Sequence, residues 1–143
     1  MGKPVENNSV SPSRAQLEVL EVVWARGEAG VAEIWEELCK RRSVARNTVQ
    51  TTVARLEARG LLRYRQVGNA FVYSATKPRT RVLRGLVARL IDTAFGGSAS
   101  SLVLSLLEDE TLSKDEADRI RALIEEKAAE SRPARPGRRG RKG

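Results

Sequence analysis

Residues 46–74 read RNTVQTTVARLEARGLLRYRQVGNAFVYS, and two patterns within them determine the fold class. In the first half, apolar side chains recur at helical spacing as far as Gly60, which predicts a helix over about residues 46–59. In the second half, two runs of β-prone residues flank Gly68-Asn69, which is the signal of a tight hairpin. A helix that leads directly into a hairpin is typical of the second half of a winged helix.

Two further helices are expected before this stretch. Ser13 and Gln16 have the spacing of a capping box, which begins a helix, and Gly27 ends that helix. A second helix begins near Val31, with its apolar residues on one side, and runs into the basic residues 40–42. The sequence therefore predicts a chain that is mainly α with a small β-hairpin, in the order of a winged helix-turn-helix domain.

The domain organisation follows from changes in pattern along the chain. Beyond Lys77-Pro78 every periodic stretch is helical, and Gly96-Gly97 interrupts the series. The two ends of the chain are polar or rich in Pro, Gly and Arg. We expect a disordered lead at 1–12, a winged-helix domain at 13–76, a second, helical domain at 77–130 and a basic disordered tail at 131–143.

The net charge of +8 is sorted along the chain. Residues 39–75 contain eight Lys or Arg and a single acidic residue, Glu57, and residues 131–143 contain six bases and no acid. Residues 1–38 instead contain seven Glu and three bases. Positive charge that is confined to one central block and one tail suits a polyanion such as nucleic acid.

The helix expected at 46–59 has two different sides. Its apolar side faces the core, and its other side carries small or hydrogen-bonding residues. A helix of this kind fits the major groove of duplex DNA and presents the residues near its N-terminus to base edges. The candidates for base contacts are Arg46, Asn47, Thr48, Gln50 and Thr51. The candidates for phosphate contacts are Arg42, Arg55, Arg63 and Arg65, with Lys40 and Arg41 beside them.

The C-terminal helices carry broad apolar stripes. A segment of this length with so many Leu and Val residues has difficulty burying them alone, and pairing with a second copy would cover them. The alternative is that the stripes pack on the chain's own N-terminal domain. The residues expected at a dimer interface are Leu83, Leu86, Leu90, Phe95, Leu102, Leu106, Ile120, Leu123 and Ile124.

The composition excludes several classes of site. The chain has no His, and Cys39 is its one cysteine, which excludes an internal disulfide and the usual zinc, copper and iron sites. No metal or cofactor is expected, and Glu108-Asp109-Glu110 is interpreted as a solvated helix end.

Ser74-Ala75-Thr76-Lys77 matches the S-x-x-K of penicillin-binding enzymes, but the serine ends a strand and the partner motifs are missing. Cys39 is interpreted as a small packing residue, with a redox sensor as the alternative.

No apolar run approaches the roughly 18 residues of a membrane span, and the first residues do not have the pattern of a signal peptide. We therefore expect a cytoplasmic protein without a membrane partner.

Several stretches together resemble one known family. They are Leu17–Trp24, Asn47–Leu56 with the following Glu57–Leu61, Phe71-Val72-Tyr73, Phe95-Gly96-Gly97, Leu102-Val103-Leu104 and Leu112-Ser113. In order and spacing they are similar to the penicillinase-repressor family of winged-helix regulators, which includes BlaI, MecI and the copper-responsive CopY branch. The resemblance covers about residues 13–128. It implies a homodimeric transcriptional repressor in which each winged helix binds half of a palindromic operator and the C-terminal helices join the protomers.

The sequence departs from the family in three places. Ala45 precedes the recognition helix where members often have a Ser or Thr cap. No cysteine follows Cys39, so the paired Cys-x-Cys motifs of the copper branch are absent. The resistance repressors are cleaved at an Asn-Phe bond just after the Gly-Gly, and this chain has residues Ser98–Ser101 there.

The sequence thus predicts a repressor that is not an enzyme, with double-stranded DNA and a second copy as partners. The signal that releases it from DNA is left open, with cleavage by a sensor protease as one candidate. Two other functions stay open: a winged helix used for protein contacts, and a ligand-sensing regulator of another winged-helix family. The short C-terminal segment, poor in aromatic residues, argues against an effector pocket.

Overall fold

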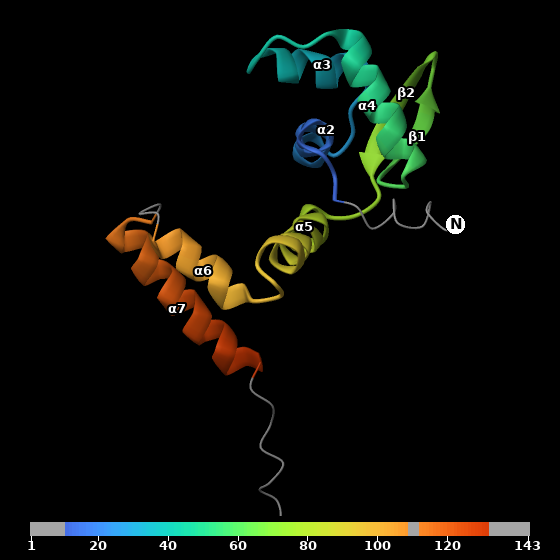
Figure 1. The fold of residues 1–143 in the computed structure, drawn as a ribbon. Coiled ribbons are helices and arrows are strands. Elements are labelled where there is room, and N and C mark those ends of the chain that lie inside the picture. The colour runs from blue at the N-terminus through green and yellow to red at the C-terminus, as the bar shows by residue number, and fades with distance from the viewer. Residues whose placement is uncertain (1–10, 109–111, 132–143) are drawn as a thin grey trace, which may run out of the picture. The chain divides into compact units, whose positions relative to one another are not determined.

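The computed structural model describes residues 11–108 and 112–131, and Figure 1 shows their arrangement within each part of the chain. The elements in chain order are α2 (Arg14–Arg26), α3 (Val31–Cys39), α4 (Arg46–Ala58), β1 (Leu62–Val67), β2 (Ala70–Ala75), α5 (Arg79–Ala94), α6 (Ala99–Glu108) and α7 (Lys114–Ser131). The chain divides into two compact units between residues 94 and 95. The lead at 1–12 and the tail at 131–143 lie almost entirely outside the described residues, so their predicted disorder stays a prediction.

The first helix, α2, has the predicted capping box. The Oγ of Ser13 accepts a hydrogen bond from the backbone N–H of Gln16 at 3.2 Å, and the side-chain oxygen of Gln16 accepts one from the N–H of Ser13 at 3.1 Å. Two of the N–H groups that a helix start leaves without partners are thereby satisfied. The helix ends at Gly27, where φ is 85° and a residue with a Cβ would be strained.

The hairpin forms at the predicted place. Strands β1 and β2 pair antiparallel with Tyr64 opposite Tyr73, and Gly68 occupies the turn with φ of 63°. Ala29, just before α3, adds a bridge to the outer side of β2: its N–H donates to the carbonyl of Tyr73 at 3.0 Å, and the N–H of Tyr73 donates back at 2.9 Å. The rings of Tyr64 and Phe71 lie 4.8 Å apart between centroids, which stiffens the exposed part of the hairpin.

One compact core joins the three helices to the base of the hairpin. Its members are Val19, Leu20, Val22 and Val23 of α2, Ala29, Ile34 and Leu38 of α3 and the link before it, Val49, Val53 and Leu56 of α4, and Leu62 of β1. Burial of a side chain of this size stabilises the fold by roughly 1.5–3 kcal/mol. The core therefore fixes α4 with its apolar side inward, and the prediction of a winged helix is confirmed.

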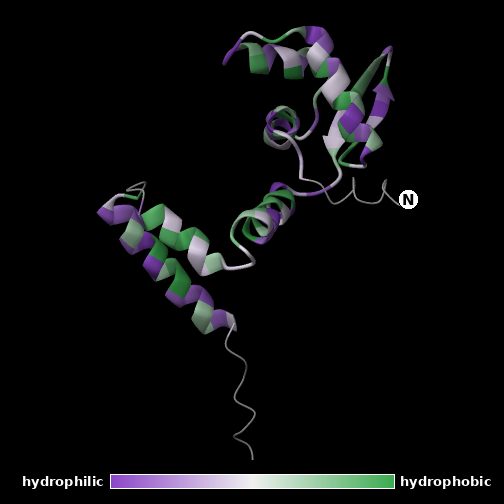
Figure 2. Cartoon of the chain, viewed as in Figure 1, coloured by the Kyte–Doolittle hydropathy of each residue, from purple (hydrophilic) through white to green (hydrophobic). Residues whose placement is uncertain are grey.

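The C-terminal helices are different, because none of their described residues is buried. Most of α6 is apolar, as the green colour in Figure 2 shows. No single helix among the described residues is both long and apolar enough to cross a membrane, although α5 and α6 taken together as a broken pair reach that length and hydropathy.

Candidate nucleic-acid interface

Helix α4 separates its buried and exposed residues as the sequence predicts. Val49, Val53 and Leu56 are at most 1% exposed. The side chains expected to contact bases lie in the first two turns of the helix, and all are exposed: Arg46, Asn47, Thr48, Gln50 and Thr51. Arg55, expected at a phosphate, is also exposed in the last turn. The first two turns thus offer guanidinium, amide and hydroxyl groups to a partner.

The start of α4 is held by α3 and not by a cap of its own. Ala45 occupies the N-cap position and has no side chain that can accept a hydrogen bond. The indole N–H of Trp35 donates to the carbonyl oxygen of Val44 at 2.8 Å. The guanidinium carbon of Arg46 lies 5.9 Å from the centroid of the same ring. The first residue of α4 is therefore packed against α3.

Arg42, in the turn between α3 and α4, is already paired within the chain. Its Nη2 lies 2.6 Å from a carboxylate oxygen of Glu18 on α2. The hydrogen bond from Arg42, together with its charge, lowers the pKa of Glu18 despite the opposing effect of burial. The side chain of Arg42 is still about half exposed, at 48%. Arg42 therefore links the turn to α2 while part of its guanidinium faces solvent.

The two arginines on β1 have different surroundings, although both are exposed and share one face of the strand. Arg65 makes a bidentate ion pair with Glu28: Nε lies 2.8 Å from one carboxylate oxygen, and Nη2 lies 3.0 Å from the other. This hydrogen bonding lowers the pKa of Glu28. Within the described residues, Arg63 makes no ion pair. The hairpin therefore presents one arginine held by a carboxylate and one that is not.

A family model described as "Penicillinase repressor" matches residues 12–126. The chain belongs to the penicillinase repressor family. It is 29% identical over 114 residues to the penicillinase repressor of Bacillus licheniformis, which covers 80% of this chain and 89% of that protein. It is 26% identical over 123 residues to the methicillin resistance regulatory protein MecI of Mammaliicoccus sciuri, covering 86% and 100%.

A solved structure supports the same architecture. The YusO protein of Bacillus subtilis is 21% identical, with a TM-score of 0.51 over 90% of this chain and 80% of that one. Like the other penicillinase repressors, the chain is a DNA-binding transcriptional repressor and not an enzyme. The family assignment made from the sequence is therefore confirmed.

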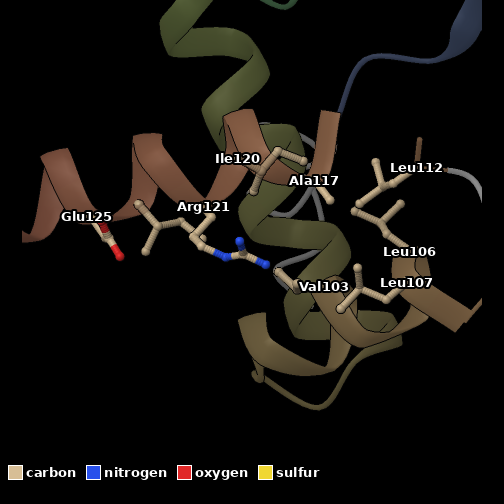
Figure 3. Close-up of a pocket in the computed structure, with 9 residues that line it drawn as sticks. Val103, Leu106, Leu107, Leu112, Ala117, Ile120, Arg121 and Glu125 are labelled. Atoms are coloured by element: carbon tan, nitrogen blue, oxygen red, sulfur yellow. The ribbon is translucent and has the colours of Figure 1, made fainter. Parts of the chain in front are cut away.

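The C-terminal helices of this repressor each expose apolar side chains. The residues expected at a dimer interface are distributed as Leu83, Leu86 and Leu90 on α5, Phe95 in the link, Leu102 and Leu106 on α6, and Ile120, Leu123 and Ile124 on α7. Leu123 and Ile124 are 48% and 56% exposed. A groove of about 330 Å³ between α6 and α7 is lined by seven aliphatic residues with Arg121 and Glu125 (Figure 3). Three of the expected interface residues, Leu106, Ile120 and Ile124, line this groove.

The sequence did not indicate the residues that hold the basic side chains. Glu18 lies 24 residues from Arg42, and Glu28 lies 37 residues from Arg65. The only related signal is the excess of acid in residues 1–38, which identifies no pair.

The interpretation of Cys39 as a packing residue is wrong: it is the exposed last residue of α3, and its Sγ faces the carbonyl of Val44 at 3.6 Å. Of the acidic run 108–110, only Glu108 is described.

Proposed function

We propose that this repressor acts as a homodimer and occupies a palindromic operator in promoter DNA, with one winged helix on each half-site. The observation that carries the proposal is the exposed polar start of α4 above a buried apolar side. A helix start with these groups matches the donor and acceptor pattern of the major groove, where Arg pairs with guanine and Asn or Gln with adenine. The protein works in the cytoplasm, by blocking access to the promoter.

The basic residues around α4 would supply the contacts that fix the register on DNA. Arg42 precedes the helix, Arg55 lies in its last turn, and Arg63 and Arg65 lie on β1. Phosphate contacts from such residues give affinity without sequence preference and depend strongly on salt. Base contacts from Arg46, Asn47, Thr48, Gln50 and Thr51 would add the sequence preference.

The exposed apolar residues of the C-terminal helices support the dimer. Side chains such as Leu123 and Ile124 are about half exposed in the single chain, so they are not part of a core of that chain. Exposed apolar side chains that lie together mark an interaction surface. A second copy related by a two-fold axis would cover them and would place two winged helices for the two halves of a palindrome.

Release from the operator requires a signal, and cleavage by a sensor protease is the candidate that the family resemblance offers. The segment concerned is Ser98–Ser101, where Ser98 Oγ accepts the N–H of Ser101 at 3.1 Å and caps α6. Incubation with a candidate protease, followed by mass spectrometry, would show whether a cut falls there. If the protease does not cut this segment, a signal other than this cleavage releases the repressor from DNA.

The base contacts are tested on a duplex that the wild-type protein selects from a randomised library. Gln50→Ala should weaken binding to the selected duplex by about 1–3 kcal/mol, or roughly 5- to 150-fold, and relax the preference at one base pair. Thr93→Ala, which shortens an exposed polar side chain on α5, is the control. Equal losses on selected and random DNA would contradict base contacts by Gln50. Absence of binding to any duplex at low salt would favour a winged helix used for protein contacts.

A further inference from the structure

We propose that Trp35 is a positioning residue for base recognition: it fixes the start of α4 and holds the guanidinium of Arg46 on the exposed side of the α3–α4 turn. The inference rests on the proposed function and deepens it. Trp35 lies on α3, outside the set of side chains that would touch DNA, so its effect would pass through Val44 and Arg46.

The ring of Trp35 connects the core to the recognition helix. It is partly buried and packs against the core, as does Val44. Its indole N–H donates to the carbonyl of Val44, one residue before the N-cap, at 2.8 Å. The tryptophan thus ties the backbone just before α4 to α3, at a point set by its own packing.

This connection matters because α4 has no side-chain cap of its own at its start. Ala45 has the extended backbone of an N-cap, but it lacks the oxygen that would accept a hydrogen bond from the first turn. The carbonyl of Ala45 accepts the N–H groups of Thr48 and Val49 at 3.0 and 3.3 Å, as a helix start requires, and nothing at Ala45 orients that turn. The bond from Trp35 to Val44 therefore adds to the core contacts of Val49 and Val53 in fixing where α4 begins.

Arg46 is held differently from the paired arginines of the interface. Arg42 and Arg65 each have a carboxylate partner, which DNA would have to replace. Within the described residues, Arg46 makes no ion pair and lies over the neutral ring of Trp35, with its guanidinium carbon 5.9 Å from the centroid. A cation–π contact limits the conformations of the side chain and leaves its N–H donors available to a guanine or a phosphate. Less conformational freedom is then lost on binding.

The test is a double-mutant cycle on the duplex selected by the wild-type protein. Trp35→Met removes both the ring and the indole N–H while filling the space with a flexible apolar side chain. Trp35→Phe keeps a smaller aromatic ring and removes the indole N–H. Each is measured alone and with Arg46→Ala, by the dissociation constant and by the preference at each base pair. Trp24→Phe is the matched control, because the indole of Trp24 also donates to a backbone carbonyl, that of Lys77, at 3.0 Å.

We expect Trp35→Met to weaken binding roughly threefold to tenfold and to relax the same base pair that Arg46→Ala relaxes, with little further loss in the double mutant. Trp35→Phe should weaken binding, because the bond to Val44 is lost, but keep the preference at that base pair, because Arg46 still lies over an aromatic ring. Trp24→Phe should leave binding unchanged. Additive effects of Trp35→Met and Arg46→Ala would overturn the inference.

Stability is followed in parallel by thermal unfolding. If Trp35→Met does not fold, Trp35→Phe decides the matter, since unchanged affinity without the bond to Val44 would overturn the inference. A wild-type protein that selects no duplex would overturn the proposed function itself. Normal selection combined with unchanged preference in all Trp35 variants would overturn only the role of Trp35.

Discussion

At the scale of single residues, the basic side chains of the interface are not equivalent. Arg42 and Arg65 are bound to carboxylates, Arg46 lies on an aromatic ring, and Arg63 has no ion pair within the described residues. A DNA phosphate that replaces Glu28 beside Arg65 contributes less binding free energy than a phosphate that pairs with an unpaired arginine. The reason is that Arg65 must first lose its bidentate hydrogen bonds to Glu28. The carboxylate also repels the DNA backbone. Glu18 and Glu28 should therefore limit affinity.

Removing the charge of Glu28 should strengthen binding to DNA of any sequence. In Glu28→Gln, Arg65 is freed from its ion pair and one repulsive charge disappears, so affinity for a random duplex should rise roughly two- to fivefold. Arg65→Ala should weaken all duplexes alike and reduce the slope of log K against log salt by about 1. Dissociation constants are measured over a salt series. Glu33→Gln, which breaks the pair of Glu33 with Arg26, is the control; weaker binding by Glu28→Gln would contradict the prediction.

The pair of Glu18 with Arg42 should make stability depend on pH. The folded state lowers the pKa of Glu18 below its ordinary 4.5, chiefly through the hydrogen bond from Arg42. The ion pair therefore stabilises the fold at pH values above the ordinary pKa of Glu18. This contribution is lost as the pH falls through the lowered pKa of the folded state. Glu18→Gln should be less stable than wild type at neutral pH, by up to about 1 kcal/mol, and the difference should vanish in acid.

Urea unfolding at a series of pH values measures this difference. Glu36→Gln is the matched control, because Glu36 is exposed on α3 and makes no ion pair within residues 11–108 and 112–131. A gap between Glu18→Gln and wild type that stays constant down to the lowest pH would show that the charge of Glu18 is not what stabilises the fold.

At the scale of elements, local patterns were enough to find the helices and the hairpin. The capping box at Ser13, the spacing of Val49, Val53 and Leu56, and the turn at Gly68-Asn69 each depend on neighbours within a few residues. Contacts between distant elements had no such signal. The bond from the Trp24 indole to the carbonyl of Lys77 joins residues 53 apart, and it follows only from the packed structure.

The missing cap of α4 gives an element-level prediction. Ala45 already has φ of −76° and ψ of 144°, which suits an N-cap, so a serine there could accept an N–H of the first turn without rearrangement. Ala45→Ser should raise the free energy of unfolding by roughly 0.5–1 kcal/mol. Ala58→Ser, at the last residue of the same helix, is the control and should give no gain. A lower stability for Ala45→Ser would mean that the turn does not allow the cap geometry.

At the scale of the whole molecule, the two compact units differ in how well they bury apolar surface. The three-helix core of the first unit buries residues such as Leu20 and Leu56, which are 1% and 0% exposed. In the second unit, α6 and α7 have no buried residue among those described. The sequence indicated the stripes on these helices, but periodicity cannot say whether a stripe meets its own chain or a second copy.

The dimer can be tested without disturbing the fold of a single chain. Ile124 is 56% exposed beside the groove between α6 and α7, so Ile124→Glu should leave the protomer folded and place a charge in the surface that a second copy would cover. Sedimentation equilibrium should show a shift from dimer to monomer, while Arg119→Glu, on an exposed part of α7, should stay dimeric.

The affinity for the operator should fall together with dimerisation. In a dimer, binding of one winged helix to its half-site holds the second winged helix near the other half-site at a high effective concentration, and a monomer lacks this gain. Affinity of Ile124→Glu for the selected palindromic duplex should fall by about a hundredfold, with no change on an isolated half-site. If Ile124→Glu remains a dimer with full affinity, the protomers associate through another surface. If the wild type is itself a monomer, the exposed stripes must serve a different partner, and binding to a palindrome would then depend on cooperation through the DNA alone.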